Sequence, residues 1–205
     1  MGTALDLIQA MTLGGLLLLC IINANSVVNE NTMIMNGSVL VQQQLISTAS
    51  LVEGEFRNMG MGVPDDSSTI TDAESNKIQF LADLNRDGNM DTVTYWLGTP
   101  SELGHVQNDS VRYLHRKTNS GPTQSVGLVS KFSLRYFSQN ELDTLTPPVA
   151  AIDLPMIKII EITMEVQNRD ALYRNPNDVK SGQRNAFYSS SYWRQTRLAS
   201  QNLKR

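Results

Sequence analysis

The first part of the chain can form only one kind of structure, because it lacks the residues that interrupt a helix. No proline occurs before Pro64, and no lysine or arginine occurs before Arg57. Residues 13–22 are uninterrupted apolar sequence, and the apolar character extends over about 4–24. A helix crosses a bilayer with about 20 apolar residues, whereas about 10–14 are more typical of a core helix or a signal peptide. No basic residue precedes the apolar run, which argues against a secretory signal.

Helical periodicity continues after the apolar run. Apolar residues recur at three-, four- and sometimes six-residue steps with Asn, Gln and Ser between them, as in an amphipathic helix. The recurring positions are Val27, Val28, Ile34, Met35, Val41, Leu45, Ile46, Leu51, Val52 and Phe56. We therefore predict one helix over residues 4–60, roughly 80 Å long at about 1.5 Å per residue. Gly14, Gly15, Gly37 and the Asn-rich stretch 23–31 are its weak points.

The remainder of the chain has the pattern of a β domain. Two glycines and Pro64 predict the end of the helix near residue 60. Alternating apolar residues then predict strands with one buried face. These residues are Ile78 and Phe80; Val93, Tyr95 and Leu97; Val111, Tyr113 and His115; Phe132, Leu134 and Tyr136; and Ile160, Ile162, Met164 and Val166, with Glu161 and Glu165 on the wet face of the last strand. Stretches 117–125, 138–150 and 168–184 are predicted loops.

These patterns predict an α+β fold, in which a long N-terminal helix with a hydrophobic first half packs on an antiparallel β-sheet domain. Residues 1–25 form the hydrophobic segment that enters a membrane or a filament core. Residues 26–60 form the amphipathic helix that continues into the globular domain. Residues 61–205 form the β-rich domain.

An oxygen-rich segment follows the predicted strand that contains Ile78 and Phe80. Its oxygen-bearing residues stand at every second position, as in the front half of a calcium loop. They are Asp83, Asn85, Asp87, Asn89 and Asp91, with Gly88 after the third. An EF-hand would need its closing Glu at Thr94, so a complete EF-hand is excluded. Two readings remain open: a calcium site in which Asn89 offers its carbonyl, and a plain hairpin turn at Asp87-Gly88.

The sequence offers no set of catalytic residues. His105 and His115 stand outside any metal-binding motif, and Cys20 lies in the apolar run, where a buried apolar role is expected. No nucleophile elbow and no phosphate-binding glycine loop occur. The formal net charge of -3 argues against a nucleic-acid partner. We therefore expect a protein that is not an enzyme.

Three segments resemble type IV pilins and the pseudopilins of type II secretion, in particular the minor, J-type pilin-like proteins. Residues 51–60 (LVEGEFRNMG) look like the helix exit of these proteins. Residues 78–85 (IQFLADLN) with 92–95 (TVTY) look like their first hairpin. Residues 192–194 (YWR) to 201–203 (QNL) look like their closing strand and tail.

The resemblance implies a role for Asp6, the one acidic residue of the apolar segment. The family has a Glu near this position, at the fifth residue after a basic leader that a prepilin peptidase removes. Here Asp replaces Glu and no basic leader is present, which suggests a processed sequence. In a filament of this family, helices bundle at the centre, and a buried carboxylate pairs with the α-amine of a neighbouring subunit, because either charge alone is costly there. An alternative is that Asp6 stays wet at the headgroup level.

The function expected from this resemblance is that of a structural subunit of a type IV pilus-like extracellular filament, assembled through its N-terminal helix. Its partners would be further pilin subunits and the inner-membrane assembly machinery, and it would move from the inner membrane to the filament. A minor pseudopilin of a periplasmic pseudopilus is the first alternative. The second is a membrane-anchored, calcium-dependent binding module that does not polymerise, whose helix over 25–57 would pack only on its own domain. An anchored periplasmic enzyme is the third.

Overall fold

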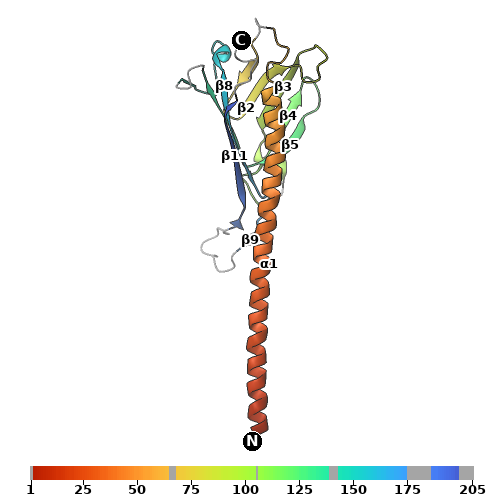
Figure 1. Cartoon of the computed structure of the whole chain (residues 1–205), viewed down its shortest axis with the longest axis vertical. Helices are drawn as coiled ribbons and strands as arrows, with labels where there is room; N and C mark the ends of the chain where they lie inside the picture. The colour runs from red at the N-terminus through yellow and green to blue at the C-terminus, as the bar shows by residue number, and fades with distance from the viewer. Residues whose placement is uncertain (1, 65–67, 105, 139–142, 175–185, 199–205) are drawn as a thin grey trace.

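The computed structural model describes residues 2–64, 68–104, 106–138, 143–174 and 186–198. A single helix, α1 (Gly2–Arg57), continues without interruption through all three glycines and the Asn-rich stretch that the sequence marks as weak points. Its N-terminal half projects from the β domain as a straight arm (Figure 1). The predicted long helix followed by an antiparallel β domain is therefore confirmed, as is the α+β class.

Two glycines end the helix in the way the sequence predicts. Gly60 and Gly62 both have positive φ angles, 77° and 78°, which residues with a side chain rarely adopt. The backbone N–H of Gly60 donates to the carbonyl of Leu81 at 2.8 Å, and the N–H of Asp83 donates to the carbonyl of Met61 at 2.9 Å. The chain is thus turned away from the helix and attached to the first sheet.

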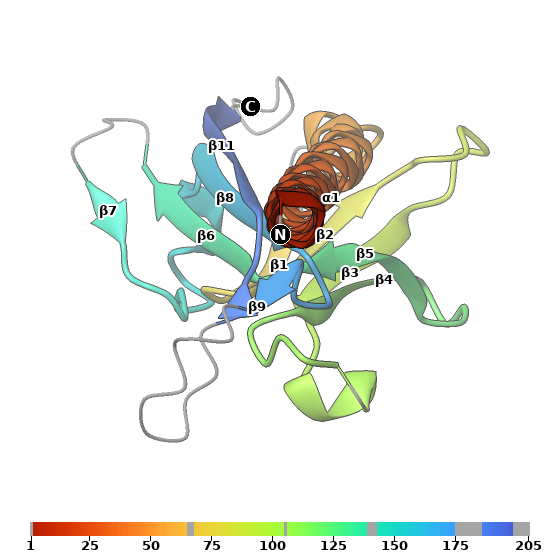
Figure 2. The same ribbon diagram turned by 90° about the horizontal axis from the view of Figure 1, so that it is seen from below.

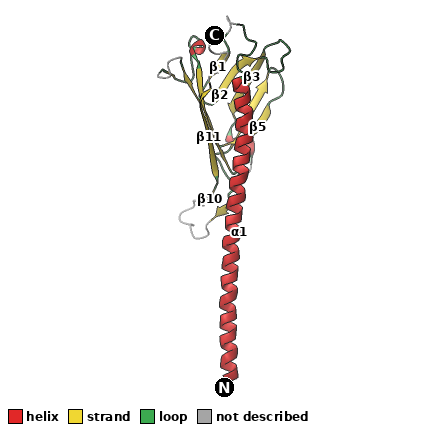
Figure 3. Cartoon of the chain, in the orientation of Figure 1, coloured by secondary structure: helices red, strands yellow, loops and turns green. Residues whose placement is uncertain are grey.

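All strand pairs of the domain are antiparallel (Figures 2 and 3). The first sheet has the order β1-β2-β3-β4-β5 and the second the order β11-β8-β6-β7, while β10 and β9 form a separate pair. The first sheet comprises β1 (Ile70–Ala73), β2 (Lys77–Ala82), β3 (Asp91–Leu97), β4 (Arg112–Thr118) and β5 (Gln124–Val129). The second comprises β6 (Lys131–Phe137), β7 (Thr144–Leu145), β8 (Ile159–Gln167) and β11 (Ser190–Leu198). The separate pair is β9 (Tyr173–Arg174) and β10 (Ala186–Phe187), and two short 3-10 turns are η1 (Pro100–Leu103) and η2 (Leu154–Met156).

Four of the five predicted strand faces are found in the structure, and the fifth is wrong. In β4 the fully buried residue is Leu114, whereas Tyr113 and His115 are half-buried on the other face. The register with β3 sets this face, because Leu114 pairs with Leu97 and Arg116 pairs with Tyr95, so both lie on the side of the buried Tyr95. Val111 is buried too, but it lies before β4 begins, so its position does not continue the alternation of the strand.

The predicted wet face of β8 is also wrong. Glu161 and Glu165 are only 5% and 8% exposed. The reason is that β8 lies inside its sheet, between β11 and β6, so that side chains of both neighbours flank its outer face. Glu161 lies 3.6 Å from the guanidinium of Arg135, and Glu165 accepts a hydrogen bond from Gln167.

The three predicted loops are shorter than expected. The stretch 117–125 contains the end of β4 and the start of β5, 138–150 contains β7, and 168–184 contains β9. Residues 139–142 and 175–184 of these stretches lie outside the described part of the chain. The sequence does not predict β5, because Gly127 and Ser125 interrupt its apolar pattern. Gly127 is needed for packing, since a Cβ there would lie 2.5 Å from the Thr48 hydroxyl of α1.

The core lies where α1 passes between the two sheets (Figure 2). Phe56 is 1% exposed, and its ring packs edge-on against Phe80 and Tyr95, with centroids 5.4 and 5.6 Å away. Val41, Leu45 and Val52 continue this contact along the helix. The C-terminal half of α1 is therefore an integral part of the domain.

A half-buried ion pair fixes the end of the helix to the first sheet. The carboxylate of Glu55 accepts hydrogen bonds from the Tyr95 hydroxyl at 2.5 Å and from Arg116 Nε at 2.9 Å. Desolvation, followed by the hydrogen bond with Glu55, holds the pKa of Tyr95 well above its usual value. The same carboxylate raises the pKa of Arg116. The side chains of Arg116 and Glu55 are 17% and 19% exposed, so the pair is largely shielded from solvent.

We expect Glu55→Gln to lower the free energy of unfolding by about 2 kcal/mol, since it leaves Arg116 without its charged partner in a largely desolvated place. The measurement is urea unfolding of the full chain in detergent, followed by tryptophan fluorescence. The matched control is Glu53→Gln, which removes an exposed ion pair with Arg57 and should cost less than about 0.5 kcal/mol. Equal effects of the two substitutions would contradict the structural role of Glu55.

Candidate assembly surface

The N-terminal arm of α1 is exposed along its whole length. Every described side chain from Thr3 to Asn29 is exposed, including those of the apolar run. By length and composition this helix can cross a membrane. Among the described residues it is the only helix that can do so. An apolar surface of this size is not stable in water, because exposed apolar patches of soluble monomers rarely exceed a few hundred Å². The arm therefore requires a membrane or other protein chains around it.

Asp6 lies on this arm, in the second turn of α1, and its side chain is exposed. It is separated by about 40 Å of helix from the first residues that the β domain covers, at about 1.5 Å per residue. Cys20 is exposed on the same arm. The fold thus keeps Asp6 free of the domain, and the pairing of its carboxylate with an amine of another subunit stays a prediction.

The amphipathic half of α1 differs from the predicted single stripe. Val41, Leu45, Val52 and Phe56 are buried, and Ile34 is half-buried. The other predicted stripe residues remain exposed together with further apolar neighbours. The exposed apolar residues of this half are Val27, Val28, Met33, Met35, Val39, Leu40, Ile46 and Leu51, with exposed fractions between 44% and 69%. The helix therefore carries apolar surface that its own domain leaves uncovered.

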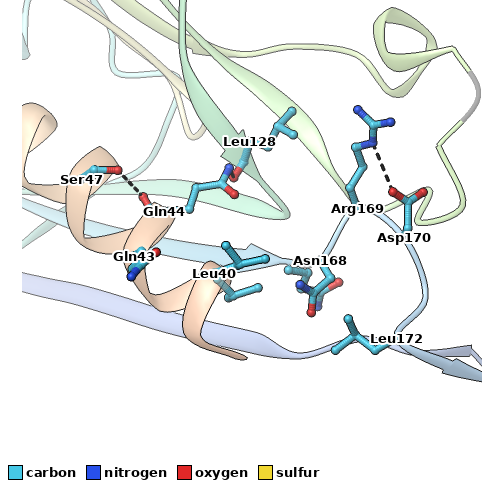
Figure 4. A pocket seen from close by; sticks show the side chains of 11 residues that line it. Leu40, Gln43, Gln44, Ser47, Leu128, Asn168, Arg169, Asp170 and Leu172 are labelled. Atoms are coloured by element: carbon cyan, nitrogen blue, oxygen red, sulfur yellow. Dashed lines mark hydrogen bonds and ion pairs between the residues drawn. The ribbon is translucent and has the colours of Figure 1, made fainter. Parts of the chain in front are cut away.

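A groove runs along one flank of this helix, beside the turn that follows β8 (Figure 4). It has a volume of about 770 Å³. Leu40 and Ser47 of α1 form one wall, and Leu128 and Leu172 contribute apolar surface from the domain. Arg169 and Asp170 lie at its edge and pair with each other at 3.5 Å.

A polar junction between α1 and the turn after β8 borders the groove. Asn168 donates from its side chain to the carbonyl of Gly37 at 3.2 Å and accepts from the N–H of Ser189 at 3.0 Å. The hydroxyls of Ser38 and Ser189 lie 2.9 Å apart. Gly37 has a packing role that the sequence did not indicate, because a Cβ there would overlap the Leu172 side chain.

The oxygen-rich segment forms the turn between β2 and β3. The Asp83 carboxylate accepts from the backbone N–H groups of Asp87 and Gly88, at 3.1 and 3.0 Å. Asp87 accepts from the N–H of Asn89 at 2.7 Å, and this bond together with that from the Asn85 amide lowers the pKa of its carboxyl. The Asp91 carboxylate instead accepts a hydrogen bond from the side-chain amide of Asn119 at 2.5 Å. Within the described residues no group of three or more acidic, His or Cys side chains is gathered into a metal site.

Calcium binding by this turn stays a prediction of the sequence and has a direct test. If Asp83, Asn85 and Asp87 ligate calcium, millimolar calcium should raise the melting temperature of the full chain by several degrees, because a ligand stabilises the state that binds it. Asp87→Ala should remove this shift. Asp109→Ala, at another exposed aspartate, is the control. An equal melting temperature with calcium and with chelator would leave the plain hairpin turn as the correct reading.

Neither histidine provides evidence for catalysis. His115 lies on β4, where its Nε2 is 2.5 Å from the Glu102 carboxylate and its ring packs beside Trp96 and Tyr113. His105 lies outside the described residues. The pairing with Glu102 attaches η1 to the sheet, and the expectation of a protein without enzymatic activity stays a prediction.

The segments that carry the pilin resemblance lie as follows. Residues 51–60 contain the end of α1, and residues 78–85 and 92–95 lie in the β2–β3 hairpin. Residues 192–194 are part of β11, whereas 201–203 lie outside the described part. Comparisons with known protein families, with curated proteins and with solved structures found no match for this chain.

Proposed function

We propose that this protein is a structural subunit of a type IV pilus-like extracellular filament and that it assembles through α1. The observation that carries the proposal is the apolar surface of α1, which extends beyond the arm onto the half that packs in the domain. The surface has few charges: none occurs between Asp6 and Glu30 or between Glu30 and Glu53. A membrane can cover the arm of an isolated subunit, but it cannot also cover Ile46 and Leu51 beside the domain.

This surface favours assembly over the alternative of a membrane-anchored module that does not polymerise. That alternative requires the helix over 25–57 to pack only on its own domain. Met35, Val39 and Ile46 are 69%, 49% and 68% exposed, which would be costly in a lone subunit. Helices of further subunits are the partners that such an uncharged, elongated face fits best.

The location and partners of the protein follow from this role. The arm would hold the subunit in the inner membrane before assembly, where a prepilin peptidase and the assembly machinery act on it. The same arm would then enter the filament core. A minor pseudopilin would use the same helix surface in a shorter periplasmic filament, so it remains the second form of the proposal.

The experiment is electron microscopy of material sheared from the cell surface, with gold-labelled antibody against the β domain. Gold label along the whole length of the filaments supports a shaft subunit. Gold label confined to the filament ends supports a minor role. Periplasmic filaments on overexpression support the pseudopilin form. Absence of any filament, with the protein confined to membranes under all conditions, contradicts the proposal.

A further inference from the structure

The exposed side of α1 carries two different apolar faces. The first, which we call the seam, consists of Val28, Met35, Val39 and Ile46, with exposed fractions of 60%, 69%, 49% and 68%. These residues follow one another at steps of seven, four and seven, which places them on one line along a helix that packs against another helix. The seam is therefore a continuous apolar ridge that a partner chain can cover.

The second face is the groove described above. Its helix wall contains Leu40, which is 62% exposed and follows Val39 of the seam by one residue, hence by about 100° around the helix. Its other wall contains Leu128 and Leu172, which belong to the β domain. The seam is a ridge of exposed side chains along the helix. The groove is a hollow between the helix and the domain (Figure 4). The two faces differ in shape and point in different directions.

The charges of both faces restrict the occupant of the groove. Residues 31–52 contain no charged side chain, so the seam beyond Glu30 is neutral. Arg169 and Asp170 at the groove edge pair with each other, which leaves an apolar floor and amide groups for contact. An apolar, uncharged ridge that runs along α1 fits this lining. Outside α1, the large apolar residues that are exposed in the described ranges are Ile152 and Met156, beside or within the short η2.

We propose that the seam of one copy docks into the groove of the next copy. The inference rests on the proposed filament function and specifies the surface through which the subunits contact one another. Contact between two different faces is heterologous, and such contacts continue from copy to copy into an open filament unless the rotation closes a ring. Contact of the seam with itself would be isologous and would stop at a dimer. The helix thus carries both halves of a repeating interface.

The test uses two full-length variants with one charge each, purified in detergent and then freed of it. Ile46→Asp disables the seam and keeps the groove, whereas Leu40→Asp disables the groove and keeps the seam. Both positions are exposed, so both variants should keep the fold, which circular dichroism checks. The matched control is Ile152→Asp, at an isoleucine that is 82% exposed and lies away from α1. Assembly is followed by sedimentation and negative-stain microscopy.

We expect the wild type and Ile152→Asp to form filaments and each helix variant alone to lose at least about 90% of the sedimenting material. An equimolar mixture of the two helix variants should form dimers without filaments, because one partner supplies an intact groove and the other an intact seam. Filaments from Leu40→Asp at the wild-type level would overturn the inference and leave the proposed function intact. Dimers from Leu40→Asp alone would show that the seam pairs with itself, and would also overturn it. Failure of the wild type to assemble would overturn both.

Discussion

Replacing Asp6 with alanine is expected to abolish filaments and to leave the β domain folded. Asp6 lies on the exposed arm, about 40 Å of helix away from the domain, so its side chain contributes nothing to the packing of the core. Removal of a polar side chain from an apolar segment also leaves the arm at least as apolar as before. The variant should therefore still be found in membranes, with the loss restricted to assembly.

The expected size of the effect follows from the environment of a filament core. Once arms of several subunits surround it, the carboxylate is removed from water and needs a partner, which the resemblance to pilins assigns to a neighbouring α-amine. Breaking such a buried pair by removing one partner costs about 3–5 kcal/mol, because the other charge is left buried alone. That is about a 100- to 4,000-fold loss in the affinity of each subunit contact, at about 1.4 kcal/mol per factor of ten.

Two further substitutions separate charge from shape at this position. Asp6→Asn keeps the size and removes the charge, so it should fail like alanine, whereas Asp6→Glu keeps the charge and should retain filaments. The measurement is the amount of sheared filament per cell, seen by electron microscopy, with membrane-bound protein as the reference. Abundant filaments from Asp6→Ala with this protein in their shaft would contradict the pairing and favour a carboxylate that stays wet.

Replacing Phe56 with alanine is expected to produce the largest loss of stability in the domain, about 4 kcal/mol. Phe56 is 1% exposed and lies where the end of α1 meets the first sheet. Its ring packs edge-on against Phe80 and Tyr95, so the substitution removes two aromatic contacts and leaves a cavity in rigid surroundings. Since domains are stable by only about 5–15 kcal/mol, this loss is a large part of the total.

The measurement is urea unfolding of the full chain in detergent, monitored by the fluorescence of Trp96 and Trp193. The matched control is Ile46→Ala, on the same helix but 68% exposed, which should change stability by less than about 0.5 kcal/mol. A loss below about 1 kcal/mol for Phe56→Ala would mean that the helix end is not part of the cooperative core. The control also tests the seam, because Ile46→Ala should weaken assembly without affecting the fold.

Several features of the fold could be predicted because they depend on neighbours in the sequence. The helix over 4–60 was predicted from the absence of proline and from apolar spacing, and α1 spans Gly2–Arg57. The end of the helix shortly before Gly60 followed from the backbone freedom of glycine. The strands at Ile78, Val93, Phe132 and Ile160 followed from two-residue alternation. This alternation shows which face of a strand is buried, but it does not show which strand lies beside it.

Other features depend on which elements meet, and no local pattern contains that information. The burial of Leu114 depends on the register of β4 with β3, and the burial of Glu161 depends on the position of β8 inside its sheet. For the candidate surface, Asp6 could be singled out because a carboxylate is conspicuous in an apolar run. The groove could not, since Leu40, Leu128 and Leu172 are distant in sequence.

The long apolar helix and the β domain can be predicted from the amino-acid sequence, because helical and strand periods are local properties of the backbone. Which apolar residues of that helix remain exposed depends on how the sheets pack against it. Val41 and Ile46 have the same character in the sequence, yet one is 2% and the other 68% exposed. The difference arises because the sheets cover one side of α1, and Gly127 allows β5 to approach that side closely.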